Sequence, residues 1–221
     1  MLVRQLSGRT LRASNYVAAA LLAAMTLVAC DVDGSPSSET IQASDSASPT
    51  SHQASVRQTD AAGRRLPFAT KFPNRWSSNN DGTTFEPCTA EASDTRTRLQ
   101  VDENSVADAA VADHQTVRGC EWKLIQPKLA YLSQFVGNFN GSLNQYKQRY
   151  AATGDQFLAD TYEAGRAVAI SPGNSECTTI VRSGTAMVFT SMSFVIEKPT
   201  REQMCEKALD YTRATINQIP E

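Results

Sequence analysis

Apolar and polar residues alternate along two neighbouring stretches in the middle of the chain. In residues 116–124 (TVRGCEWKL), Cys120, Trp122 and Leu124 fall on one side and charged residues lie between them. This alternation is typical of a half-buried strand. Residues 128–139 (KLAYLSQFVGNF) follow after a short Ile-Gln-Pro break and fit a second strand, antiparallel to the first. The two stretches therefore predict a β-hairpin.

Three further stretches toward the C-terminus have strand character, at about residues 161–170, 176–182 and 185–196. The turn sequences Ser-Pro-Gly-Asn and Ser-Gly separate them. Alternate positions of the last stretch form one face, which we expect to point toward the core. That face consists of Ala186, Val188, Thr190, Met192, Phe194 and Ile196.

Helical signals stand between and after these strands. Residues 105–113 predict a short helix, and residues 142–152 predict a second one that begins with the capping box Ser-Leu-Asn-Gln. A third helix begins at Pro199 and Thr200, with Gln203 completing a capping box. Its apolar face is formed by Cys205, Ala208, Leu209, Thr212, Ile216 and Ile219.

This order of elements predicts an α+β fold. Long antiparallel hairpins followed by separate helices are typical of an antiparallel sheet that carries its helices on its faces. We therefore expect a single domain over residues 84–221, with an antiparallel sheet of about five strands.

The N-terminal region has a different pattern. Arg4, Arg9 and Arg12 precede an uncharged stretch over residues 14–29, which is short for a membrane-spanning helix and typical of a secretory signal peptide. The alternative is a short membrane helix. The stretch ends in Leu-Val-Ala-Cys at Cys30, which resembles the lipobox of bacterial lipoproteins, where the cysteine thiol receives a diacylglycerol.

A polar segment follows Cys30. Residues 31–65 contain no Leu, Met, Phe, Tyr or Trp, so they cannot bury enough apolar area to offset the cost of ordering. We accordingly divide the chain into a signal peptide (1–29), the lipidated Cys30 with a disordered tether (30–83), and the folded domain (84–221). Within the tether, residues 64–76 (RRLPFATKFPNRW) mix basic and aromatic residues. Such a segment either touches acidic headgroups or a partner, or lays its aromatic rings on the domain.

Four cysteines remain when Cys30 carries lipid. An exported chain folds where disulfides persist, so an even number of cysteines predicts two bridges. Sequential pairing closes the shortest loops and is our first expectation, while the other two connectivities stay open. Sequential pairing joins Cys88 to Cys120 and Cys177 to Cys205.

The contexts of these cysteines carry a family resemblance. The motifs FEPC (85–88), RGCEW (118–122) and CEKAL (205–209), with the single Cys177, resemble the actinobacterial lipoprotein family catalogued as domain of unknown function 3558. The resemblance covers residues 84–219 and agrees with the lipobox upstream. It implies a lipid-anchored protein on the extracytoplasmic face of the cell membrane. It implies no catalytic residue, because the family has no assigned reaction.

Charge and motif content narrow the classes of function. Removing residues 1–29 takes away three arginines and no acid, so the formal net charge falls from −2 to −5, which argues against nucleic-acid binding. The chain has two histidines, no nucleotide-binding loop and no nucleophile elbow. We therefore expect no catalytic residue, no cofactor and no metal site.

Aromatic residues of the central hairpin are the best candidate ligand-binding residues. Trp122, Tyr131 and Phe135, with Phe139 beyond them, line an apolar pocket if the sheet curls away from its helices. The alternative is ordinary core packing.

Two functions follow from these observations. The first is a non-enzymatic envelope module that binds a protein, a lipid or a small ligand. The alternative is a hydrolase that acts on envelope glycans or esters. Its candidate residues are His114 or the acidic group Asp155, Asp160 and Glu163.

The anchor is directly testable. We expect Cys30→Ser to release or mislocalise the protein and to leave both disulfides intact, because Cys30 is the cysteine that does not pair. Fractionation of membrane and soluble material, with thiol counting, measures both effects. A variant that stays membrane-bound with its signal uncleaved would show that the apolar run itself is the anchor.

Overall fold

The computed structural model describes residues 56–221. The expected signal peptide, Cys30 and the first part of the tether lie outside the described residues.

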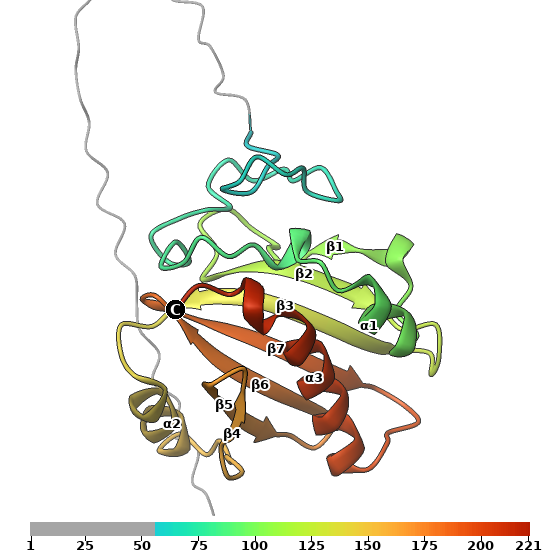
Figure 1. Cartoon of the computed structure of the whole chain (residues 1–221). Coiled ribbons are helices and arrows are strands. Elements are labelled where there is room, and N and C mark those ends of the chain that lie inside the picture. Colours follow the sequence, from blue (N-terminus) through green and yellow to red (C-terminus); the bar gives the residue numbers. More distant parts are fainter. Residues whose placement is uncertain (1–55) are drawn as a thin grey trace, which may run out of the picture. The chain divides into compact units, whose positions relative to one another are not determined.

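The described part contains one antiparallel sheet of seven strands in the order β1-β2-β3-β7-β6-β5-β4, with helices packed on it (Figure 1). The predicted α+β class and the antiparallel sheet are confirmed, and the expected number of about five strands is wrong. The strands are β1 (Ala107–Asp108), β2 (Val117–Lys123), β3 (Ala130–Asn138), β4 (Thr161–Glu163), β5 (Arg166–Pro172), β6 (Glu176–Ser183) and β7 (Ala186–Phe194), and the α-helices are α1 (Ser93–Arg98), α2 (Leu143–Ala151) and α3 (Arg201–Thr215).

The two additional strands are both short edge strands. The stretch expected as one strand over 161–170 is a hairpin, because the chain turns at Ala164 and Gly165, whose φ values are 49° and 80°. The hairpin divides the stretch into β4 and β5. Short edge strands of this kind limit pairing with other chains.

The helix expected over 105–113 does not form. Ser105 accepts a hydrogen bond from the backbone of Lys123 at 2.7 Å instead of capping a helix. Ala107 and Asp108 pair with β2 as strand β1, and the Asp108 carboxylate binds Arg75. Tertiary hydrogen bonds outweigh the weak local helix propensity at this place.

Helix α3 covers one face of the sheet. It begins at the capping box of Thr200 and Gln203, as predicted, and packs across β6 and β7. The alternate β7 residues from Ala186 to Phe194 are buried, and the apolar ones among them belong to the two core clusters that also contain α3 residues. Ile196 is an exception: it lies beyond the end of β7 and is 48% exposed.

Two disulfides fasten the ends of the domain to the sheet. Cys88–Cys120 joins the 3-10 turn Pro87–Thr89 to β2, and Cys177–Cys205 joins β6 to α3. The sequential pairing is therefore the one present in the structure.

The segment that precedes residue 84 is part of the folded unit. Thr59 and Arg65 form a bridge, Leu66 is buried in the main core, and Phe68 and Trp76 pack against it. Of the two interpretations of residues 64–76, the structure shows aromatic rings laid on the domain. The boundary at residue 84 is corrected: the tether cannot include residues 56–83.

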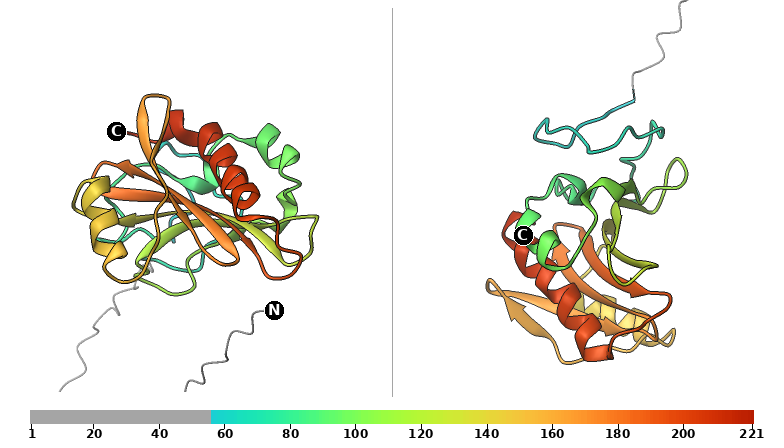
Figure 2. Two further views of the ribbon diagram at one scale, coloured as in Figure 1. Left: turned by 90° about the horizontal axis from the view of Figure 1, so that it is seen from below. Right: turned by 90° about the vertical axis from the view of Figure 1, so that its right-hand side faces the viewer.

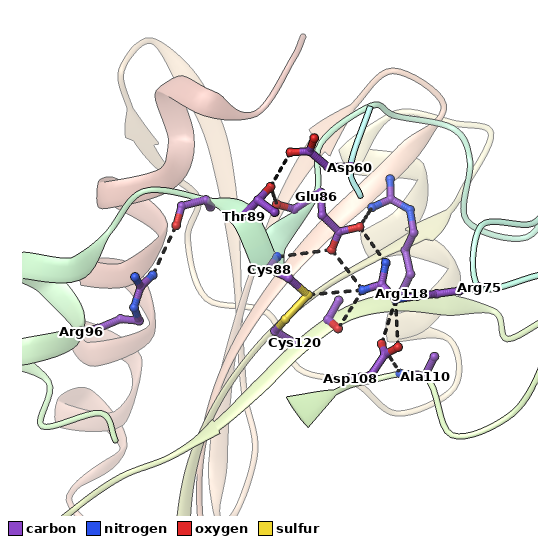
Figure 3. Close-up of a disulfide and its surroundings, with 12 residues drawn as sticks. Asp60, Arg75, Glu86, Cys88, Thr89, Arg96, Asp108, Ala110, Arg118 and Cys120 are labelled. Atoms are coloured by element: carbon purple, nitrogen blue, oxygen red, sulfur yellow. Dashed lines mark hydrogen bonds and ion pairs between the residues drawn. A yellow bond between two sulfur atoms is a disulfide. The ribbon is translucent and has the colours of Figure 1, made fainter. Parts of the chain in front are cut away.

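A buried ion cluster holds this segment in place (Figure 3). Arg75 donates to the Glu86 carboxylate at 2.8 and 3.1 Å and to Asp108 at 2.9 and 3.0 Å. Arg118 donates to Glu86 at 3.1 Å, and the side chains of Arg75, Glu86 and Arg118 are almost completely buried. Burial by itself lowers the pKa of Arg75, but the carboxylates of Glu86 and Asp108 together have the larger effect, so the pKa is raised.

This cluster predicts a large loss of stability when one partner is removed. Glu86→Ala leaves two buried guanidinium groups without their shared carboxylate, so we expect the free energy of unfolding to fall by about 3–5 kcal/mol. Urea denaturation measures it. Glu206→Ala, which breaks an exposed pair with Arg213, is the control and costs at most about 1 kcal/mol. Equal losses in the two variants would contradict the role of the cluster.

Candidate functional site

The face of the sheet opposite α3 is only partly covered. Helix α2 has nine residues and packs over β5, β6 and β7 through Leu143 and Tyr146, against Ala169, Ile180 and Met187. The two helices lie on opposite faces of the sheet (Figure 2). The rest of this second face, which we call the open face, keeps side chains of β2, β3 and β7 partly accessible.

Two stacked phenylalanines form the floor of the open face. Phe135 of β3 lies directly opposite Phe189 of β7, with ring centroids 5.0 Å apart and planes inclined by 20°. On its other side Phe135 pairs with Gly119 of β2, where an added Cβ would lie 2.1 Å from the carbonyl oxygen of Gln134. Strands β2 and β3 therefore approach too closely for a side chain at residue 119, and Phe135 is left uncovered on that side.

Tyr146 connects this floor to α2. Burial raises the pKa of its hydroxyl, with further contributions from Tyr150 and Asp155. Its ring contacts four other aromatic rings, so the aromatic residues form one continuous cluster. The centroid distances are 5.2 Å to Phe139, 4.3 Å to Tyr150, 6.4 Å to Phe157 and 5.6 Å to Phe189.

A pocket of about 560 Å³ lies over this cluster. That volume is within the usual range of small-molecule sites. Its floor comes from β3, β5, β6 and β7, and its walls come from α2, residues 154–157 and the β5–β6 turn. The charged residues that line it are Asp155, Glu176 and Arg201. The apolar ones are Val117, Phe135, Tyr146, Phe157, Pro172, Ile180 and Phe189.

The structure separates the aromatic residues that the sequence grouped. Phe135 lines the pocket, whereas Trp122 is 3% exposed on the opposite face, against Tyr211 of α3. Tyr131 shares the open face with Phe135 but lies outside the pocket lining. The three residues therefore do not form one site: Trp122 points to the other face of the sheet, and Tyr131 lies on the same face as Phe135 but away from the pocket.

The residues named for a hydrolase are also dispersed. Asp155 lines the pocket, Asp160 pairs with Lys147 at 2.7 Å, and Glu163 pairs with Arg213 at 3.0 Å. His114 is exposed in the loop after β1. Within residues 56–221 no three metal-ligating side chains come together.

Sequence reasoning missed most of the pocket residues. Tyr146 falls inside the helix predicted over residues 142–152, with nothing in that pattern to mark it as a pocket residue, and Phe189 falls on the face of its strand opposite to the expected core face. One signal was available: Met187 and Phe189 make β7 apolar on both faces, which indicates cover on both sides.

Comparison with known proteins gives one match. The model of the family described as "Protein of unknown function (DUF3558)" matches residues 25–218. The chain belongs to the DUF3558 family. No curated protein and no solved structure matches the chain. Among residues 56–221, none of the helices has the length and apolar character needed to cross a membrane.

Two of the motifs by which the chain resembled the DUF3558 family, FEPC and RGCEW, meet at the buried ion cluster, while Cys177 and the cysteine of CEKAL form the second disulfide. Glu86 of FEPC binds Arg118 of RGCEW, and the cysteines of the same two motifs form a disulfide. These contacts are buried, so the two motifs stabilise the domain and do not line the pocket.

The buried Tyr146 generates a pH prediction. A raised pKa in the folded state means that its protonated form contributes stability below about pH 10, the pKa of an unfolded tyrosine, and that this contribution is lost as pH rises further. Tyr211, whose pKa burial also raises, acts in the same direction. We expect Tyr146→Phe to reduce the alkaline loss of stability by up to about 1.4 kcal/mol per pH unit.

Urea denaturation across the alkaline range measures this slope. Tyr162→Phe, at an exposed position of β4, is the matched control and leaves the slope unchanged. A slope in Tyr146→Phe equal to that of the unsubstituted protein would contradict the assignment.

Proposed function

We propose that this protein is a non-enzymatic binding module of the cell envelope that takes a small amphiphilic ligand in the pocket of the open face. The observation that carries the proposal is the stacked pair Phe135 and Phe189 at the base of a pocket of about 560 Å³. When an apolar ligand covers aromatic surface that is accessible in the folded protein, apolar area is removed from water and the free energy of the complex is lowered.

The lining of the pocket favours an amphiphile over a purely apolar molecule. Its aromatic floor suits an apolar ring or chain, and the carboxylates of Asp155 and Glu176 and the guanidinium of Arg201 suit polar groups at the edge. The ligand class is therefore one with an apolar part and a polar or charged end.

The proposal includes the location of the protein. The residues around Cys30 resemble a lipobox, and a diacylglycerol with a further acyl chain holds a protein on a membrane stably. We place the domain on the extracytoplasmic face, where the lipid anchor attaches it to the membrane. Its ligand is an envelope lipid, protein or small molecule.

The hydrolase alternative has less support. Asp160 and Glu163 are engaged in separate ion pairs, and His114 lies outside the pocket lining. We therefore place binding before catalysis.

Binding is testable with an environment-sensitive naphthylamine dye titrated into the protein. We expect saturable fluorescence enhancement. We expect Phe157→Asp to weaken the affinity at least about tenfold, because it removes an aromatic wall and adds a charge. The matched control is Leu158→Asp, at the adjacent exposed position, which is outside the pocket lining and leaves the affinity unchanged.

Two outcomes would contradict the proposal. Equal affinities of Phe157→Asp and Leu158→Asp would place the dye elsewhere. Turnover of an ester or glycan substrate that Asp155→Asn abolishes would make the pocket an active site.

A further inference from the structure

Exposed apolar side chains concentrate at one end of the sheet. Seven large apolar side chains are exposed in residues 56–221, and four of them belong to the β2–β3 loop and the β7–α3 loop. Their exposed fractions are 60% for Ile125, 52% for Leu129, 59% for Val195 and 48% for Ile196. We call these four residues the apolar tip.

The two loops of the apolar tip are joined and presented as a unit. The backbone N–H of Val195 donates to the carbonyl of Leu129 at 3.0 Å, and the N–H of Ile125 donates to the carbonyl of Gln100 at 2.7 Å. Leu129 has a φ of 56°, an uncommon conformation for a non-glycine residue. The loops thus have fixed neighbours, and their aliphatic side chains point outward with nothing in the domain to cover them.

Basic residues surround the apolar tip. Lys123, Lys128 and Lys198 are exposed, and none of them takes part in an ion pair among the described residues. Glu197 is the acidic residue within the two loops. Aliphatic side chains ringed by lysines complement the surface of an anionic bilayer, where the chains enter the headgroup region and the ammonium groups meet the phosphates.

We infer that the apolar tip docks on a membrane surface that carries anionic phospholipids. Arg201 follows the β7–α3 loop directly and lines the pocket, so docking brings one edge of the pocket close to the bilayer. The inference does not rest on the ligand of the pocket. It also does not depend on how the N-terminal region is attached, since it concerns a second contact made by the folded domain.

The test uses the full chain reconstituted in vesicles whose lipids carry bromine on their acyl chains, which quenches nearby tryptophan. A tryptophan introduced as Ile196→Trp reports on the apolar tip, and one introduced as Tyr162→Trp, on the edge strand β4, is the matched control. The unsubstituted chain, with two tryptophans, gives the background. In vesicles containing phosphatidylglycerol we expect quenching at residue 196 and none at residue 162.

Charge is tested by neutralisation. Lys128→Gln and Lys198→Gln should each lower the ratio of docked to undocked domains about fivefold, as expected for one basic residue near an anionic surface. Arg149→Gln and Arg182→Gln, also exposed and without ion pairs in the described part, are the controls and leave the ratio unchanged.

Three results would overturn the inference. The first is equal quenching, or none, at residues 196 and 162. The second is quenching at residue 196 that is the same in phosphatidylcholine vesicles as in anionic ones. The third is self-association of the chain in detergent that Ile125→Asp abolishes, because it would assign the apolar tip to a contact between copies. Failure of dye binding in the pocket would leave these readouts unaffected, so the two proposals fail separately.

Discussion

One constraint governs the domain over residues 56–221: its seven-stranded sheet has two faces, and within these residues one long helix is available to cover them. Helix α3 buries one face completely enough for Leu132, Met192 and Phe194 to lose contact with solvent. The second face receives α2, which is much shorter, and its aromatic side chains must partly cover one another. The accessible floor made by Phe135 and Phe189 is the direct result of this unequal cover.

Buried ion pairs, in addition to apolar packing, hold the N-terminal segment (residues 56–83) on the domain. Arg75, Glu86 and Arg118 form buried ion pairs at the junction between this segment and β2, next to the disulfide Cys88–Cys120 (Figure 3). Arg201 belongs to the pocket lining and is the first residue of α3, directly after the β7–α3 loop of the apolar tip. The ligand pocket and the proposed membrane contact are therefore adjacent.

Much of the fold was predictable because it follows local patterns. The alternation around Trp122 and the capping boxes at Ser142 and Thr200 correctly indicated strands and helices. Packing of the aromatic rings of residues 64–76 on the domain was among the interpretations of the sequence, but the domain boundary was set too late, at residue 84, because the buried ion pairs that also hold this segment leave no apolar periodicity. The pocket was only partly predictable: Phe135 was identified, but grouping it with Trp122 ignored the alternation of strand faces, and Phe189 comes beside it only through tertiary pairing.

The most direct test of the central claim compares the aromatic residues on the two faces of the sheet. NMR spectra of aromatic-labelled protein, titrated with a short-chain anionic amphiphile, report on each ring separately. The account predicts saturable shifts for Phe135 and Phe189 on the open face and for Tyr146 of α2, and none for Trp122 and Tyr211, which pack against each other between the opposite face and α3. Shifts confined to Trp122 and Tyr211, or no shift of any ring at saturating amphiphile, would contradict it.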